Sequence, residues 1–206
     1  MNKIITIGRQ FGSGGHEIGE LIAKHYGITC YDKELLARAA KDSGYSEELI
    51  KNHDERPTNS FLYNLVMDTY SMGYYSGTYV DMPIGQKIFL AQFETIKTVA
   101  KEGACVIVGR CADYALQDLP NCVNIFIHAD IHKRAANVMD KFNLTEDKAY
   151  ELIQKKDKQR QSYYNYYSNK KWGNSASYHI SVDSGILGIE GTAEFLETFI
   201  EKSSFH

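Results

Sequence analysis

The stretch IITIGRQFGSGGHEIG, residues 4–19, decides the fold expected of this chain. Its apolar, β-branched start at residues 4–7 predicts a buried strand. The glycine-rich turn GSGG at residues 12–15 follows and opens a segment of helical apolar spacing, which Gly27 ends. Glycine lets the backbone approach an anion closely, and the amide groups of a first helical turn point toward it. Strand, glycine loop and helix in this order therefore predict a phosphate-binding loop.

Two known loop patterns fit the glycine-rich turn in part. In the P-loop pattern G-x-x-x-x-G-K-S/T, with Gly14 as the second glycine, Arg9 takes the place of the first glycine. Gly15 and His16 then stand where the pattern has lysine and a hydroxyl residue. In the dinucleotide-binding pattern G-x-G-x-x-G, Glu17 stands at the third glycine. A plain strand-to-helix turn is a third interpretation, but it needs fewer glycines than this loop has. We favour the phosphate-binding loop.

The composition is that of one ordinary globular domain. With 206 residues, 43% hydrophobic and 24% charged, the chain suits one α/β domain with a small insertion and is too apolar to be disordered. A net charge of −3 gives no overall attraction to nucleic acid. The four cysteines show no C-x-x-C spacing, which favours free thiols in a reducing compartment. Because no signal peptide and no membrane-spanning run are evident, we expect a cytoplasmic protein without a membrane or nucleic-acid partner.

Strand and helix signals alternate along the rest of the chain. Further strands are expected at residues 28–31, 105–108, 123–128 and 179–183, and helices at 32–42, from 46, at 83–102, after 128, from 145 and at 189–202. This order predicts a three-layer α/β fold with a five-stranded parallel sheet flanked by helices. Ser46 and Thr145 are expected as helix N-caps. Asp32 is interpreted either as a third N-cap or as a site residue.

Residues 57–83 differ in character from the rest of the chain, because they are rich in tyrosine and show little periodicity. Such a stretch is typical of a mobile insertion on a scaffold. One interpretation is a lid or acceptor-binding flap whose rings stack on a base. The other is a contact in a homo-oligomer, since tyrosine and methionine suit interfaces. The sequence leaves both open.

Other chemistry-bearing patterns are weaker. The basic segment KKDKQR, residues 155–160, is by itself typical of a solvated helix face. His128 and His132 straddle the end of a strand, so they form a poor metal-binding pair and no metal-binding residues are predicted. The chain contains no G-x-S-x-G nucleophile elbow.

Taken together, these features resemble the cytidylate kinase-like family, a divergent group of P-loop nucleoside monophosphate kinases. The loop FGSGGHEIG resembles a variant found in that family. Asp32 followed by Arg38 has the spacing of the family segment D-S/T-G-A-x-Y-R. Gly109 and Arg110 match the first two residues of the segment G-R-D, with Cys111 in place of its aspartate.

The second half of the chain carries the resemblance further. The segment from Asp130 to Arg134 is similar to the one whose arginine begins the family's lid. Asp157 and Arg160 match the D-x-x-R of the lid helix, so residues of about 134–172 are expected to form a lid region. The tail ISVDSGILGIEGTAEF is similar to the family's final strand and helix. The resemblance implies a single P-loop NTPase-type kinase domain over residues 1–206, with a small acceptor-binding and lid insertion.

The resemblance implies transfer of the ATP γ-phosphoryl group to a nucleoside monophosphate, with CMP or dCMP as the acceptor and Mg²⁺ as the metal. Positioning and charge neutralisation dominate such chemistry. The residues implied to bind the ATP phosphates are Gly12, Ser13, Gly14, Gly15, His16 and Glu17. Those implied to bind the acceptor are Asp32, Arg38, Arg110 and Asp157. Those implied to act on the transferring group are Arg134 and Arg160, and the partners are small-molecule nucleotides.

The missing P-loop lysine bears on activity, because one cation at developing charge is worth several powers of ten in rate. Our hypothesis is that Arg9, beside the loop, supplies this charge. An alternative is a catalytically weak nucleotide-binding protein of kinase fold that acts as a regulator. A nicotinamide-dependent oxidoreductase is a more distant alternative.

Overall fold

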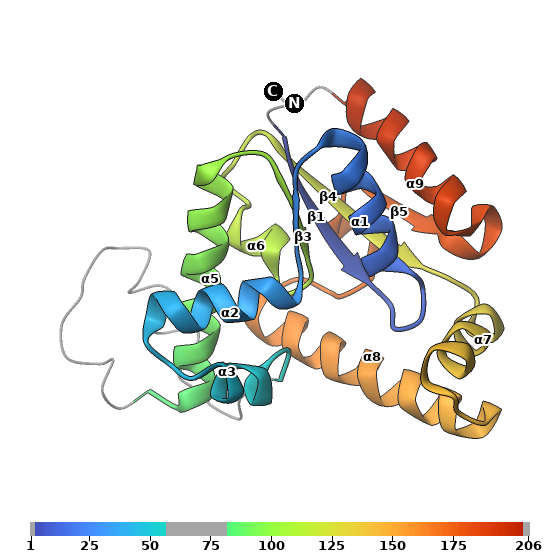
Figure 1. The fold of residues 1–206 in the computed structure, drawn as a ribbon, viewed down its shortest axis with the longest axis horizontal. Coiled ribbons are helices and arrows are strands. Elements are labelled where there is room, and N and C mark those ends of the chain that lie inside the picture. Colours follow the sequence, from blue (N-terminus) through green and yellow to red (C-terminus); the bar gives the residue numbers. More distant parts are fainter. Residues whose placement is uncertain (1–2, 57–81, 204–206) are drawn as a thin grey trace.

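The structure is a computed structural model that describes residues 3–56 and 82–203. Five parallel strands form one sheet in the order β2-β3-β1-β4-β5. Their bounds are β1 Ile4–Arg9, β2 Thr29–Tyr31, β3 Cys105–Val108, β4 Cys122–His128 and β5 Ile180–Asp183. The predicted five-stranded parallel sheet is thus confirmed. All five carboxyl ends lie at the same edge of the sheet, above the long helix that crosses the lower part of Figure 1.

Helices cover both faces of the sheet (Figure 1). Their bounds are α1 Gly15–Tyr26, α2 Lys33–Ser43, α3 Glu47–His53, α5 Ile84–Glu102, α6 Ala112–Ala115, α7 Ile131–Phe142, α8 Glu146–Ser168 and α9 Ser184–Lys202, with a short 3₁₀ helix at Ser175–Ser177. In the described part of the chain no helix is long and apolar enough to cross a membrane.

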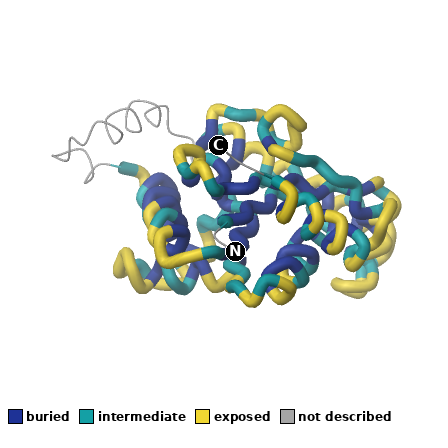
Figure 2. Tube along the Cα trace, turned by 90° about the horizontal axis from the view of Figure 1, so that it is seen from above, coloured by how far each residue is buried: buried dark blue, intermediate teal, exposed yellow. Residues whose placement is uncertain are grey.

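The alternation of side chains along each strand separates two hydrophobic cores. Ile5 and Ile7 of β1 pack in one core with residues of α1 and α9. Ile4 of β1 and Ile107 of β3 pack in the other, with residues of α5, α6 and α8. Successive strand residues point to opposite faces, so a strand buried on both faces is apolar throughout. Figure 2 shows in dark blue the stretches of the chain that are buried, with exposed stretches in yellow around them.

Two helix pairs extend beyond the sheet near its carboxyl edge. The first pair, α2 and α3, packs Leu36 and Ile50 together with Ile88 of α5. The second pair, α7 and α8, packs Val138 and Ile153 together, with Phe11 of the loop after β1 against them. The expected lid region of about 134–172 lies on this second pair. Most of the expected insertion at 57–83 lies outside the described residues.

Several expected helix ends differ from the observed ones. Ser46 caps α3 as expected, because its hydroxyl accepts a hydrogen bond from the Leu49 amide at 3.2 Å. Thr145 and Asp32 stand at the N-cap positions of α8 and α2, but neither side chain makes the capping hydrogen bond. The last helix begins at Ser184 rather than 189, with non-helical geometry at Gly188 between its two parts.

Candidate active site

The conformation of the loop after β1 is fixed by hydrogen bonds from buried hydroxyl groups. The Ser13 hydroxyl donates a hydrogen bond to the Ile127 carbonyl at 3.2 Å, and the Ser184 hydroxyl donates one to the Ser13 carbonyl at 2.7 Å. Ser13 is 1% exposed, so its side chain fixes the loop and does not face a ligand. Its backbone remains part of the loop. The Ser13 hydroxyl thus helps to fix the shape of the loop, and it is not available to bind a ligand.

The glycines of this loop are required by close neighbours as well as by their backbone angles. Gly12 and Gly14 have φ of 82° and 75°. A Cβ on Gly12 would lie 2.8 Å from the Arg134 carbonyl oxygen, and one on Gly14 would lie 2.9 Å from Ile189. Helices α7 and α9 therefore pack against the loop more closely than any other residue type allows.

The start of α1 opens onto a cavity of about 620 Å³. Gly15 is the first residue of α1, and no side chain of the described residues caps this helix. The first amide groups of an uncapped helix carry a partial positive charge and are available to an anion. The Asn137 side chain donates to the Gly12 carbonyl at 2.9 Å and joins α7 to the cavity wall. The cavity therefore presents the features expected of a phosphate-binding loop.

A second cavity of about 280 Å³ adjoins the first. The two share a wall made of Arg9, Phe11, Asp32, Lys33 and Arg160. The remaining lining of the second cavity is rich in cations, with Lys51, Arg56, Arg110 and Lys156 beside Asp54, Glu55 and Gln159. Its seven cations outnumber its three carboxylates, so this cavity favours an anionic ligand.

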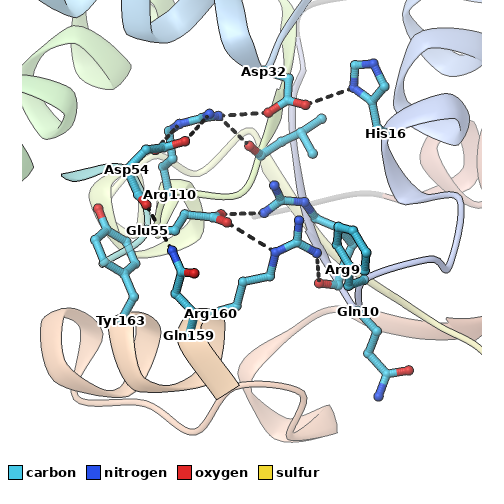
Figure 3. A network of polar contacts seen from close by, with 12 residues as sticks. Arg9, Gln10, His16, Asp32, Asp54, Glu55, Arg110, Gln159, Arg160 and Tyr163 are labelled. Atoms are coloured by element: carbon cyan, nitrogen blue, oxygen red, sulfur yellow. Dashed lines mark hydrogen bonds and ion pairs between the residues drawn. The ribbon is translucent and has the colours of Figure 1, made fainter. Parts of the chain in front are cut away.

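Arg110 occupies the carboxyl end of β3 and is 4% exposed (Figure 3). Its Nε and Nη2 atoms donate to the two carboxylate oxygens of Asp54, both at 2.9 Å, and its Nη1 donates to Asp32 at 2.9 Å. Burial alone would lower the pKa of Arg110, but Asp54 and Asp32 raise it above its ordinary value. The guanidinium is therefore a fixed positive charge. His16 Nδ1 lies 3.0 Å from the other oxygen of Asp32.

Glu55 bridges two further arginines across the shared wall (Figure 3). One carboxylate oxygen accepts from Arg9 Nη1 at 2.6 Å, and the other accepts from Arg160 Nε at 3.1 Å. Arg160 also donates to the Arg9 carbonyl at 3.2 Å and lies over the Phe11 ring, 5.5 Å from its centroid. Burial alone would raise the pKa of Glu55, but Arg9 and then Arg160 lower it well below its ordinary value. The two arginines thus hold Glu55, whose side chain is 12% exposed, in its ionised form.

Asp54 and Glu55 were not among the residues singled out in the sequence. They follow α3 in a turn, and only the packing of α3 against α2 and α5 carries them to the arginines. No motif marks them. The one signal in this segment is the run of charged residues Asp54, Glu55 and Arg56 before Pro57, which is equally typical of an exposed turn.

The structure brings most of the expected site residues together. Arg9, Asp32, Arg110, Arg160 and the residues of the glycine loop line the two cavities, apart from Ser13. Arg38 lies apart from them. It lines neither cavity, and its guanidinium pairs with Asp42 at 3.1 Å and with Glu102 at 2.7 Å on the surface. Because Glu102 ends the helix that leads into β3, Arg38 faces the opposite edge of the sheet.

Arg134 and Asp157 also lie apart from these residues, because neither lines either of the two cavities. Arg134 is 7% exposed and donates to the Asp157 carboxylate at 2.6 Å and to the Ala129 carbonyl at 3.0 Å. The other oxygen of Asp157 accepts from the Phe11 amide at 2.7 Å. This pair therefore ties α7 and α8 to the glycine loop.

Comparison with known proteins agrees with this geometry. The model of the family described as the cytidylate kinase-like family matches residues 4–186. The chain belongs to the cytidylate kinase-like family. This confirms the resemblance seen in the sequence. A comparison with curated proteins gave no match.

Solved structures extend the comparison of this cytidylate kinase-like chain. An uncharacterized protein from Eubacterium ventriosum ATCC 27560 is 30% identical to it, with a TM-score of 0.74 over 98% of this chain and 99% of that one. Shikimate kinase from Bacteroides thetaiotaomicron is 11% identical, with a TM-score of 0.54 over 98% of this chain and 99% of that one. At that identity the likeness shows the fold alone. Family and fold together support a phosphotransferase of the kinase class.

The residues of the cytidylate kinase-like site fit a nucleotide and a divalent metal to different extents. The uncapped start of α1 and the cavity above it suit the phosphates of ATP. The described residues hold no group of three or more metal-ligating side chains. Mg²⁺ is usually held by one or two carboxylates together with substrate phosphates and water, so a ready-made cluster is not required. Glu17 and Asp32 are the carboxylates at the loop cavity nearest the start of α1 in sequence.

Proposed function

We propose that this chain transfers the γ-phosphoryl group of ATP to a nucleoside monophosphate, with CMP or dCMP as the acceptor. The observation that carries the proposal is the shared wall of the two cavities. The loop cavity suits the phosphates of a donor, the second cavity attracts an anion, and Arg9 and Arg160 stand between them. A phosphoryl group that passes from one ligand to the other crosses this boundary. The family supports the nucleotide as donor and the acceptor class.

The residues of this site would act by binding and charge neutralisation. The amides of the loop and of the first turn of α1 would hold the donor phosphates. Arg110, at the carboxyl end of β3, would bind the acceptor phosphate, since a guanidinium fork matches two phosphate oxygens. Arg9 and Arg160 would neutralise the charge that develops between donor and acceptor. Bound Mg²⁺ would add positive charge at the donor phosphates.

The position of Arg9 supports its role as the replacement for the P-loop lysine. A Cβ on Gly15 would lie 2.6 Å from the Arg9 Cβ, so the two positions cannot both carry a side chain in this backbone. The P-loop pattern has glycine at the position of Arg9 and lysine at that of Gly15. In this chain the basic residue is at position 9 and the glycine is at position 15, the reverse of the P-loop pattern. A cation therefore stays beside the loop, although it starts from the strand and not from the helix.

One observation favours the alternative of a weakly active nucleotide-binding regulator. Arg9, Arg110 and Arg160 are all paired with carboxylates of the chain in this structure. A protein whose arginines stay paired would bind ATP at the loop and turn it over slowly.

The test is ADP production from Mg-ATP with CMP, dCMP, UMP, AMP and GMP in turn. We expect turnover with CMP or dCMP, a strong loss in Arg160→Ala, and near-normal turnover in the matched surface variant Arg38→Ala. Saturable ATP binding without turnover for any acceptor would contradict the kinase and favour the regulator. Equal loss in both arginine variants would contradict the roles that the cavities assign to them.

A further inference from the structure

The turn formed by Asp54 and Glu55, called here the acidic turn, faces three arginines at once. Asp54 binds Arg110 through both carboxylate oxygens, and Glu55 binds Arg9 and Arg160 through one oxygen each. All three of these arginines line the second cavity. We propose that the acidic turn is an internal stand-in for the substrate phosphate, which occupies the arginines in the ligand-free protein and is displaced when an anionic substrate binds.

The donor inventory of Arg110 carries the first step of this inference. A guanidinium has five N–H groups. Two of those on Arg110 go to Asp54, one goes to Asp32 at 2.9 Å and one goes to the Val108 carbonyl at 3.2 Å. At most one N–H is left for a ligand. A phosphate can therefore bind the Arg110 fork through two oxygens only if Asp54 leaves it.

Charge carries the second step. Asp32, Asp54 and Glu55 cancel the charges of Arg9, Arg110 and Arg160, so the cluster as it stands is neutral. Departure of the acidic turn leaves two uncompensated positive charges, and a phosphate monoester carries about −1.5 to −2 at neutral pH. The exchange therefore keeps the cluster close to neutral. Without it, the incoming phosphate would meet the carboxylates of Asp54 and Glu55 at the arginines and would be repelled by them.

The backbone of the acidic turn carries the third step, because little besides the ion pairs holds it. Glu55 has a φ of 50°, which is unfavourable for a residue other than glycine. The Asp54 amide donates to the Lys51 carbonyl at 3.4 Å, and the Arg56 amide donates to the His53 carbonyl at 3.2 Å. Gln159 donates to the Asp54 carbonyl, and Gln92 Nε2 donates to Asp54 Oδ1, both at 3.3 Å. These bonds are long compared with the ion pairs at 2.6–3.1 Å, so the turn is fixed mainly by the arginines themselves.

The test compares Asp54→Asn and Glu55→Gln with the unaltered protein by isothermal titration calorimetry. The probes are CMP and inorganic phosphate. We expect each variant to bind both probes about three- to tenfold more tightly, because a competing charge has been removed while the side-chain shape is kept. Glu48→Gln is the matched control, since it removes one exposed carboxylate from α3, the helix that precedes the acidic turn, and should leave both affinities unchanged. Weaker or unchanged binding in both acidic-turn variants would overturn the proposal.

A second measurement needs no variant and covers the case in which one fails to fold. Hydrogen–deuterium exchange of residues 47–56 is followed in the unaltered protein with and without CMP. Displacement predicts faster exchange with CMP, whereas a ligand that binds over an intact turn predicts slower or unchanged exchange and overturns the proposal.

This inference rests on the proposed function only in requiring that the substrate carries a phosphate. Different results would contradict the proposed function and the role of the acidic turn. Loss of turnover for every nucleotide acceptor contradicts the proposed function, and the phosphate titration still decides the role of the acidic turn. Absence of phosphate and CMP binding in the protein and all variants overturns the role of the acidic turn.

Discussion

Position 15 illustrates how one residue excludes another. The Arg9 side chain leaves the end of β1 and passes under the first residue of α1, where a Cβ on Gly15 would lie 2.6 Å from the Arg9 Cβ and 3.1 Å from its Cγ. Farther along, Arg9 Nη1 fills the space above Gly109, where a Cβ would lie 2.0 Å away. Glycine at both positions thus follows from the path of one arginine across the site.

This packing predicts a coupling between positions 9 and 15. Gly15→Lys alone should lower the free energy of unfolding by about 1–3 kcal/mol, because it forces a side chain into occupied space. Arg9→Gly removes the obstructing Cβ, so the double variant should be more stable than the sum of the two single effects indicates. Chemical denaturation of all four proteins measures the coupling. Additive losses would show that the two side chains do not compete.

The two expected acceptor arginines should behave differently. Arg110→Lys keeps the charge but loses the guanidinium fork, so we expect its KM for CMP to rise about tenfold, as for loss of one charge-assisted contact. Arg38→Lys, the same change on the surface, should alter KM less than about twofold, in line with the small effects of exposed ion pairs. Steady-state kinetics with CMP varied at saturating ATP checks both. A larger effect at Arg38 would restore it to the acceptor site.

At the scale of elements, the sequence predicts a strand best where it is buried on both faces, and a helix end best where a glycine follows the helix. The strand at 105–108 is observed at the expected residues, because a strand buried on both faces reads as a continuous apolar run. Gly27 ends α1 as expected, and Gly27 and Gly44 take the left-handed conformation at the ends of α1 and α2. The predicted parallel sheet and family are both confirmed.

Sheet topology made part of the site predictable. Arg9 ends β1 and Arg110 follows β3, so the shared carboxyl edge of the parallel sheet brings them together. For Arg38, the spacing after Asp32 indicated a role in acceptor binding. The direction of its side chain, however, depends on which face of α2 packs against α5. Asp54 and Glu55 reach the arginines only through the packing of α3. Tertiary contacts of this kind leave no local pattern in the sequence.

The helix N-caps give a matched prediction at this scale. Ser46→Ala removes the hydrogen bond to the Leu49 amide and should cost about 1 kcal/mol of stability. Thr145 is at the equivalent N-cap position of α8 but makes no capping hydrogen bond. Thr145→Ala should therefore lower the stability clearly less. Thermal unfolding of the two variants beside the parent measures the difference. Equal losses would mean that the cap positions, and not their hydrogen bonds, determine the cost.

At the scale of the whole molecule, carboxylates with little exposure to solvent join the separate layers. Asp32 and Glu55 connect the helix pair α2 and α3 to the sheet and to α8 through Arg110, Arg9 and Arg160. Asp113 connects α6 to α8, since its carboxylate accepts a hydrogen bond from the Tyr164 hydroxyl at 2.7 Å. Stability of the assembled fold therefore depends on whether these groups are ionised.

Their pKa shifts predict how stability changes with pH. Burial alone would raise the pKa of Asp32 and of Glu55, but the arginines lower both below their ordinary values. Such groups stabilise the fold above their unfolded pKa values of about 4, and this contribution is lost as the pH falls through their lowered folded values. Asp113 has the opposite sign, because burial raises its pKa and protonation favours the folded state. With two groups against one, we expect the melting temperature to fall as the pH is lowered below about 4.

The contribution of Glu55 to this acid limb is testable by itself. In Glu55→Gln no carboxylate titrates between Arg9 and Arg160, so the melting temperature should be lower than that of the parent at neutral pH and should fall less between about pH 5 and pH 2. Glu48→Gln, an exposed position, should follow the parent curve. Differential scanning calorimetry across this range compares the three proteins. If Glu55→Gln keeps the full slope of the parent, acid unfolding is governed by other carboxylates, and the bridge between the two arginines contributes little to holding the helix pair on the sheet.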